Sequence, residues 1–225
     1  MMTKQVLIFL HMDDEHPGYI ADHLQKKNIP YRIVRGYQGD PIPVLDESMA
    51  GLVFMGGTMS VNDNIPWMNQ EIQLIQQALY NNVPLLGHCL GGQLITKALG
   101  YDVTANTVEE VGWHYCYRQK NASAADWLGD IKDPFTMFHW HLETFALPAE
   151  AQLLFSSKHC HNQAYSYGDN VLAMQGHVEM TEPLVLDWIT KWRDHLRDTT
   201  PSTQNYEQIK ESLVPNVAAL NQVAE

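Results

Sequence analysis

The sequence has few cysteines and comparatively little positive charge. Three cysteines in 225 residues are too few, and odd in number, to form a complete disulfide framework, which indicates a reducing compartment. Lysine and arginine together number 14 against 26 aspartates and glutamates, so the formal net charge is -12. Such a charge repels nucleic acids and anionic membrane surfaces, and we expect neither as a partner.

Long apolar runs are also missing. The run at residues 6–10 is among the longest, far short of the roughly 20 residues that span a bilayer, and the N-terminus lacks the pattern of a cleavable signal. We therefore expect a cytoplasmic protein. With 225 residues and 45% hydrophobic content the chain can enclose a full core, and one large domain fits this length better than two small ones.

The first half of the chain alternates two kinds of segment. Short apolar runs rich in branched residues predict strands at residues 5–10, 31–35, 51–55 and 83–88. Apolar residues at helical spacing predict helices at 19–27 and 67–80. This alternation predicts an α/β fold with an open, mostly parallel sheet and helices on both faces, in which the carboxyl ends of the strands carry the chemistry.

The second half adds more short strands to the same sheet, followed by a helix. Strands are expected at residues 108–117, 135–139, 152–156, 164–167 and 170–174, and a helix that docks on the sheet at 183–196. A Thr/Pro/Ser stretch then leads into an amphipathic helix near the C-terminus. We predict a main domain over residues 1–196 and a linker with a helical appendage over 197–225.

The most specific local pattern surrounds Cys89. A buried strand runs into Gly-His-Cys-Leu-Gly at 87–91 and then into a helix, which matches the G-x-nucleophile-x-G turn that exposes a nucleophile at its apex. A thiol at a helix N-terminus is favoured as thiolate by the helix dipole, and a nearby imidazolium would favour it further. A buried, inert cysteine in a glycine-rich turn is the alternative. Cys116 and Cys160 lack such a turn and are expected to be structural.

A base for this thiol is available in Gln-Gly-His-Val-Glu at 175–179, directly after a predicted strand. His177 and Glu179 are two residues apart, so in an extended segment they share a face and the carboxylate could orient the imidazole. On its own this pair is weak evidence, because the chain has 11 histidines and Glu179 could simply begin a helix.

Together the two motifs resemble those of class I glutamine amidotransferases, whose elbow is G-x-C-x-G and whose late motif is Q-F-H-P-E. The resemblance covers roughly residues 5–195 and is closest to stand-alone proteins similar to the amidotransferase domain of GMP synthase. Gly176, Val178 and Thr58 depart from the usual Phe, Pro and Pro, which bears on substrate shape. Further collinear matches are Gly-Gly-Thr-Met-Ser at 56–60, Glu-Val-Gly-Trp at 110–113, Trp-His-Leu-Glu-Thr-Phe-Ala-Leu-Pro at 140–148 and Asn-Gln-Ala-Tyr at 162–165.

The resemblance implies a flavodoxin-like fold and a set of functional residues. Cys89, His177 and Glu179 would form the catalytic triad, and the backbone N–H groups of Gly57 and Leu90 would form the oxyanion hole. Gly56, Gln93 and His141 would contact the substrate. The implied reaction is hydrolysis of a γ-glutamyl amide through a thioester, either glutamine to glutamate and ammonia or a related γ-glutamyl compound.

Two histidine pairs, His139/His141 and His159/His161, have the alternating spacing found in some metal sites. No carboxylate cluster accompanies them and a thiol mechanism needs no ion, so we expect neither a metal nor another cofactor.

Partners beyond the small-molecule substrate stay open. One possible partner is a separate synthetase that accepts ammonia, since the tail of this chain is too short to be such a domain. A second copy of this chain, in a homo-oligomer, is another. Two alternative functions also stay open: a non-catalytic regulatory or partner-binding protein that retains the fold, and a deglycase or peptidase relative with a similar cysteine elbow. A triad out of hydrogen-bond reach or a closed pocket would favour the non-catalytic alternative.

Overall fold

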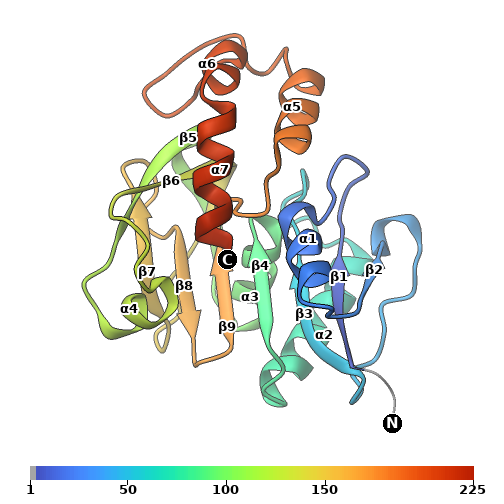
Figure 1. Cartoon of the computed structure of the whole chain (residues 1–225). Helices are drawn as coiled ribbons and strands as arrows, with labels where there is room; N and C mark the ends of the chain where they lie inside the picture. The colour runs from blue at the N-terminus through green and yellow to red at the C-terminus, as the bar shows by residue number, and fades with distance from the viewer. Residues whose placement is uncertain (1–3) are drawn as a thin grey trace.

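The structure is a computed structural model that describes residues 4–225. Within this range nine strands form one sheet in the order β2-β1-β3-β4-β9-β8-β7-β5-β6 (Figure 1). The five strands from β2 to β9 in this order are parallel to one another. They are β1 (Gln5–Phe9), β2 (Tyr31–Val34), β3 (Met49–Phe54), β4 (Leu85–His88) and β9 (Val171–Met174).

The other side of the sheet is antiparallel. Its strands are β5 (Val103–Arg118), β6 (Phe135–Phe145), β7 (Gln152–Ser157) and β8 (Ala164–Tyr167). The predicted strands are all present, but β6 extends past residue 139, where the prediction ended. Polar residues such as His141 and Glu143 interrupt the apolar pattern there, although the backbone stays paired with β5.

Helices cover both faces of the parallel half, because consecutive residues of a buried strand point to opposite sides. Leu7 and Phe9 of β1 pack in the same cluster as residues of α2 (Pro66–Tyr80) and α3 (Leu90–Ala98). Ile8 packs instead with residues of α1 (Gly18–Lys26). The predicted α/β fold class is therefore confirmed.

Three short elements were not predicted or differ from the prediction. The 3-10 turn η1 (Gly36–Gln38) and the helix α4 (Ala122–Leu128) lie in stretches for which no helix or strand was predicted. Asn121 caps α4 by accepting a hydrogen bond from the Ala124 N–H, which stabilises this short helix without a long apolar stripe. The helix expected at 183–196 is α5 (Glu182–Lys191), which ends earlier.

The C-terminal segment forms α6 (Tyr206–Glu211) and α7 (Leu213–Ala224). In Figure 1, α7 lies across one face of the molecule, and the C-terminus comes close to α1, where Tyr19 and Lys26 both bond the Glu225 carboxylate. The apolar side chains of this segment belong to the same buried cluster as Trp113 and Phe138; they are Ile209, Leu213, Val217 and Leu220. The division at residue 196/197 stays a prediction.

No helix within residues 4–225 combines the length and the apolar character needed to cross a bilayer.

Candidate active site

Cys89 occupies the turn between β4 and α3 in a backbone conformation that side chains rarely adopt. Its φ is 49° and its ψ is -113°, and it stands at the N-cap of α3. Strain of this kind is held in place by surrounding contacts, here hydrogen bonds from the Cys89 N–H to Met174 O (2.8 Å) and from the Gly91 N–H to Met55 O (3.0 Å). The turn therefore has the geometry predicted for a nucleophile elbow.

The flanking glycines allow β3, β4 and α3 to approach closely. A Cβ atom on Gly91 would lie 1.9 Å from the carbonyl oxygen of Phe54, and one on Gly87 would lie 2.5 Å from the Gly91 backbone. Because a real Cβ cannot come so near a backbone atom, this packing requires glycine at both positions. The sequence spacing at 87–91 thus reflects a steric need of the turn.

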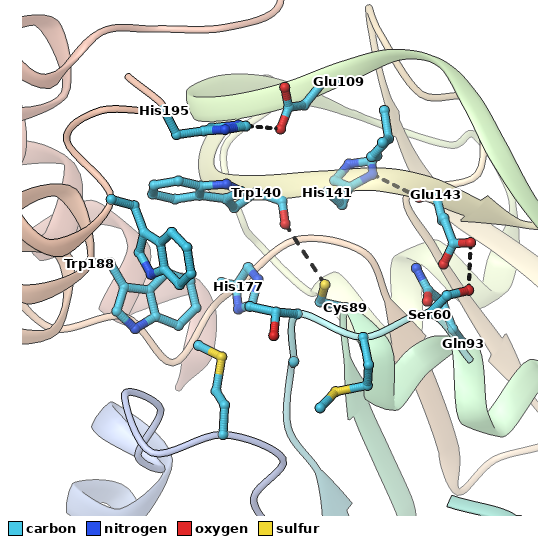
Figure 2. Close-up of a pocket in the computed structure, with 16 residues that line it drawn as sticks. Ser60, Cys89, Gln93, Glu109, Trp140, His141, Glu143, His177, Trp188 and His195 are labelled. Carbon is cyan, nitrogen blue, oxygen red and sulfur yellow. Dashed lines mark hydrogen bonds and ion pairs between the residues drawn. The ribbon is translucent and has the colours of Figure 1, made fainter. Parts of the chain in front are cut away.

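His177 and Glu179 are hydrogen bonded, with 2.6 Å between His177 Nδ1 and Glu179 Oε1 (Figure 2 draws His177 beside Cys89). Burial alone would lower the pKa of His177, but the Glu179 carboxylate and hydrogen bonding with Cys89 and Glu179 raise it well above its ordinary value. Burial works against the charge of Glu179 too, yet His177 and His88 hold the pKa of Glu179 down at about 2. These directions favour an imidazolium beside a carboxylate.

Glu15, from the loop between β1 and α1, is a buried carboxyl next to this pair that the sequence argument did not find. It accepts a 2.8 Å hydrogen bond from the Gly56 N–H. Burial, reinforced by the charge of Glu179, raises the pKa of Glu15 to about 7. It therefore changes protonation near neutral pH, beside the His177–Glu179 pair.

His11, from the same loop, orients the Gly56–Gly57 peptide. Its Nδ1 lies 2.8 Å from Met55 O and 3.0 Å from Gly56 O, and its Nε2 lies 2.9 Å from Glu71 Oε2. Carbonyl and carboxylate oxygens only accept, so both ring nitrogens carry protons. Burial opposes this charge, but Glu71 raises the pKa of His11 above its ordinary value.

This contact determines which way the next N–H points. In a trans peptide the C=O and the following N–H lie on opposite sides, so the Gly57 N–H points away from His11. Within residues 4–225, neither the Gly57 N–H nor the Leu90 N–H donates to another protein group. Both are free donors on segments that flank Cys89.

A cavity of about 400 Å³ opens over this region. Trp188 packs edge-on against the His177 ring, with 5.1 Å between ring centroids. The residues around the cavity include Cys89, Gln93, Trp140, His141, His177 and Trp188 (Figure 2). The cavity is open, and His177 and Glu179 are within hydrogen-bond reach of each other, while the Cys89 thiol lies 3.9 Å from the Trp140 carbonyl oxygen.

The three residues expected to contact the substrate differ in position. Gln93 lines the cavity, and its amide donates to Gln175 Oε1 at 3.3 Å. His141 also lines it, but both of its ring nitrogens already have protein neighbours, the Glu143 carbonyl and the Glu110 carboxylate. The Gly56 N–H is directed to Glu15. Substrate contact by these residues stays a prediction.

The remaining cysteines are buried, Cys116 in β5 and Cys160 in the loop between β7 and β8. Burial raises the pKa of the Cys116 thiol well above its ordinary value, and it raises that of Cys160 to about 11. Both thiols are therefore protonated near neutral pH and poor nucleophiles.

The two histidine pairs lie in different kinds of backbone structure. His139 and His141 lie on β6 and share a face, whereas His159 and His161 lie in the loop after β7 and do not share a strand. Among the described residues, two groups have the spacing of metal ligands. One is Glu15, His177 and Glu179, and the other is Glu110, His139 and His141.

Comparison with known proteins identifies relatives of the whole chain. The family model described as glutamine amidotransferase class-I matches residues 17–183. The glutamine amidotransferase-like protein YfeJ of Salmonella typhimurium is 30% identical over 225 residues, which covers 93% of this chain and 94% of that protein. A crystal structure of a glutamine amido transferase from Methylobacillus flagellatus superposes with a TM-score of 0.95 at 37% identity, over 99% of this chain and 91% of that one.

Two further relatives have more specific names. γ-Glutamyl peptidase 3 of Arabidopsis thaliana is 25% identical, over 63% of this chain and 59% of that protein. GMP synthase (glutamine-hydrolyzing) of Cytophaga hutchinsonii is 27% identical over 81% of this chain, but the match spans only 34% of the synthase.

Proposed function

Because this chain belongs to the class-I glutamine amidotransferase family, we propose that it is a cysteine hydrolase that cleaves γ-glutamyl amide bonds. Cys89 is the nucleophile, His177 its base and later the acid, and Glu179 the group that orients His177. The observation that carries the proposal is the strained Cys89 turn beside the 2.6 Å His177–Glu179 hydrogen bond at an open cavity.

In the first half-reaction the Cys89 thiolate attacks the amide carbon, and a C–S bond forms as the carbonyl oxygen becomes an oxyanion. The free N–H groups of Gly57 and Leu90 bind this oxyanion, and each such donor typically lowers the barrier by about 3 kcal/mol. The C–N bond then breaks, and His177 gives its proton to the leaving nitrogen. The products are an amine and a γ-glutamyl thioester on Cys89.

In the second half-reaction water hydrolyses the thioester. His177, now neutral, takes a proton from the water as it attacks, and the same donors bind the second oxyanion. Collapse of this intermediate releases a γ-glutamyl carboxylate and regenerates the Cys89 thiolate. The raised pKa of His177 supports this division of roles, since the imidazolium is the acid that the first step needs.

Two versions of this reaction differ in the amine that leaves. With glutamine the amine is ammonia, and a separate synthetase could accept it, as the match to only one third of GMP synthase suggests. With a γ-glutamyl peptide the amine is an amino acid, and the similarity to γ-glutamyl peptidase 3 supports this possibility. We propose that the chain carries out this hydrolysis by itself in the cytoplasm, and that a synthetase partner, where one exists, receives the ammonia.

The test is a screen of the purified protein against glutamine and a panel of γ-glutamyl compounds, with Cys89→Ala as the matched control. We expect release of the amine from at least one compound by the unmodified protein, and none by the variant. Equal release by the two proteins would mean that another group or a contaminant is responsible.

A further inference from the structure

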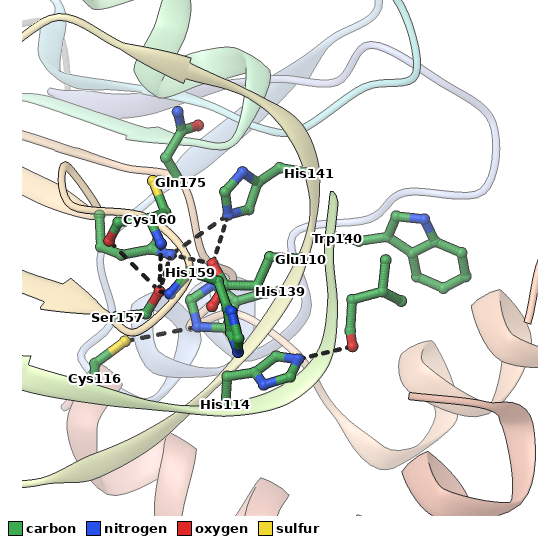
Figure 3. A network of polar contacts seen from close by, with 12 residues as sticks. Glu110, His114, Cys116, His139, Trp140, His141, Ser157, His159, Cys160 and Gln175 are labelled. Carbon is green, nitrogen blue, oxygen red and sulfur yellow. Dashed lines mark hydrogen bonds and ion pairs between the residues drawn. The ribbon is translucent and has the colours of Figure 1, made fainter. Parts of the chain in front are cut away.

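A second cluster of titratable side chains lies outside the proposed catalytic group, on β5 and β6 (Figure 3). Its members are Glu110, His139 and His141, which are between 0% and 4% exposed. One ligand atom from each lies within 4.8 Å of the others. The mechanism proposed above uses none of the three as an acid, base or nucleophile.

Strand pairing brings these residues together. Glu110 of β5 pairs directly with His141 of β6, and His139 is two residues before His141, on the same face of the strand. The arrangement therefore follows from backbone register.

The protons on His141 are constrained by its neighbours. Its Nδ1 lies 2.9 Å from the Glu143 carbonyl oxygen, which can only accept, so Nδ1 carries a hydrogen. In a neutral ring Nε2 then presents a lone pair, 3.1 Å from Glu110 Oε2. A donor or a cation must lie between two such acceptors, and the Gln163 amide nitrogen, which contacts both, occupies that place in this structure. A metal-binding histidine commonly donates its other N–H to a carbonyl in this way.

His139 presents a similar arrangement. Its Nε2 lies 3.6 Å from Cys116 Sγ, and its Nδ1 lies 3.8 Å from Glu110 Oε2 (Figure 3). Within residues 4–225, neither His139 Nδ1 nor Glu110 Oε1 has a hydrogen-bond partner. Leaving such buried groups unpaired is costly, and native proteins rarely do so.

We propose that Glu110, His139 and His141 bind a divalent transition-metal ion, for which zinc is the probe. Two imidazole nitrogens and a carboxylate are a ligand set that suits zinc. The ligands would be His139 Nδ1, His141 Nε2 and a Glu110 oxygen. Glu110 Oε2 lies 3.1 Å from His141 Nε2 and 3.8 Å from His139 Nδ1. These distances are near those between ligand atoms around a four-coordinate ion, so binding needs only small shifts.

Gln163, in the segment between β7 and β8, supplies a fourth ligand. Its amide nitrogen donates to Glu110 Oε2 and Ser157 Oγ and lies 3.4 Å from His141 Nε2, while its Oε1 has no partner within residues 4–225. Rotation of the amide by half a turn directs Oε1 toward the cluster. The ion would then join β5 and β6 to this segment, behind the cavity wall that His141 forms.

The sequence argument against a metal rested on the lack of a carboxylate cluster beside the histidine pairs. The fold brings one carboxylate to His139/His141, because Glu110 is 31 residues from His141 in sequence and opposite it in the sheet. The competing explanation is a metal-free ion pair between a protonated His141 and Glu110.

The protein is expressed with added zinc and dialysed against a chelator to remove loosely bound ions. The bound zinc is then released by denaturation and measured. We expect about one zinc ion per chain, and X-ray absorption at the zinc edge with nitrogen and oxygen neighbours only. His139→Gln and His141→Gln should each lose most of the zinc. His161→Gln, at an exposed histidine, and His177→Gln, in the other candidate group, should retain it.

Three results would overturn the proposal. In the first, the unmodified protein holds far less than one zinc ion per chain, and its melting temperature is the same whether or not zinc is added during expression. Another is a sulfur-dominated spectrum, and the third is zinc that His177→Gln removes but His139→Gln does not. None of these readouts depends on hydrolysis, so failure here leaves the proposed function standing.

Discussion

His11 Nδ1 lies 3.0 Å from the carbonyl oxygen of Gly56, and this contact determines the direction of the Gly57 N–H. Glu71 keeps His11 charged and in place from the other side of the ring. The proposed oxyanion hole is therefore pre-oriented in the free chain, by residues that do not line the cavity.

We predict that His11→Ala lowers kcat by about 10-fold to 100-fold, less than complete loss of an oxyanion donor, because the peptide can then rotate. Alkylation of Cys89 by iodoacetamide forms no oxyanion, so its rate should stay nearly unchanged. His161→Ala, at an exposed position, is the control. If both reactions slow equally, His11 supports the fold as a whole and does not orient the peptide.

A second prediction concerns the division of roles in the triad. Glu179 acts through His177, so Glu179→Ala should reduce kcat less than either Cys89→Ala or His177→Ala. Loss of the Glu179 charge should also lower the pKa of His177, which NMR titration of the inactive but folded Cys89→Ala background can follow. A Glu179→Ala enzyme as impaired as Cys89→Ala would contradict these roles.

A third prediction follows from the pKa of Glu15, which burial raises from 4.5 to about 7. Between these values the folded chain binds more protons than the unfolded chain, so this group makes the protein less stable as the pH rises. Glu15→Gln removes the effect. Relative to the unmodified protein, the variant should gain roughly 3 kcal/mol in unfolding free energy between pH 5 and pH 8.

Urea denaturation at the two pH values measures this difference, and Glu47→Gln, at an exposed carboxyl, is the control. No gain for Glu15→Gln beyond that of Glu47→Gln would mean that the Glu15 carboxylate is well accommodated at neutral pH.

The sequence predicted the features that depend on local patterns. The elbow glycines at 87 and 91 are fixed by steric contacts within one turn, and His177 and Glu179 are neighbours in an extended segment, so both could be recognised from spacing. The sheet followed from the same alternation of apolar runs. These features need no knowledge of distant contacts.

The features that the sequence argument missed depend on residues brought together by the fold. His11 and Glu71 are 60 residues apart, and Glu15 is 41 residues from Gly56, whose N–H donates a hydrogen bond to it. The one available signal was the presence of polar residues directly after the buried strand β1, at the end of the sheet that carries Cys89. Pairing Glu110 with His141 required the register of β5 and β6.

The most direct test of the central claim, that Cys89 is the nucleophile of a γ-glutamyl site, is intact-protein mass spectrometry after incubation with a glutamine-like electrophile. The unmodified protein, Cys116→Ala and Cys160→Ala should each gain one adduct, mapped to Cys89 by peptide digestion, with or without a chelator. Cys89→Ala should gain none. Labelling of Cys116 or Cys160 while Cys89 stays free, or labelling abolished by chelation alone, would contradict the account.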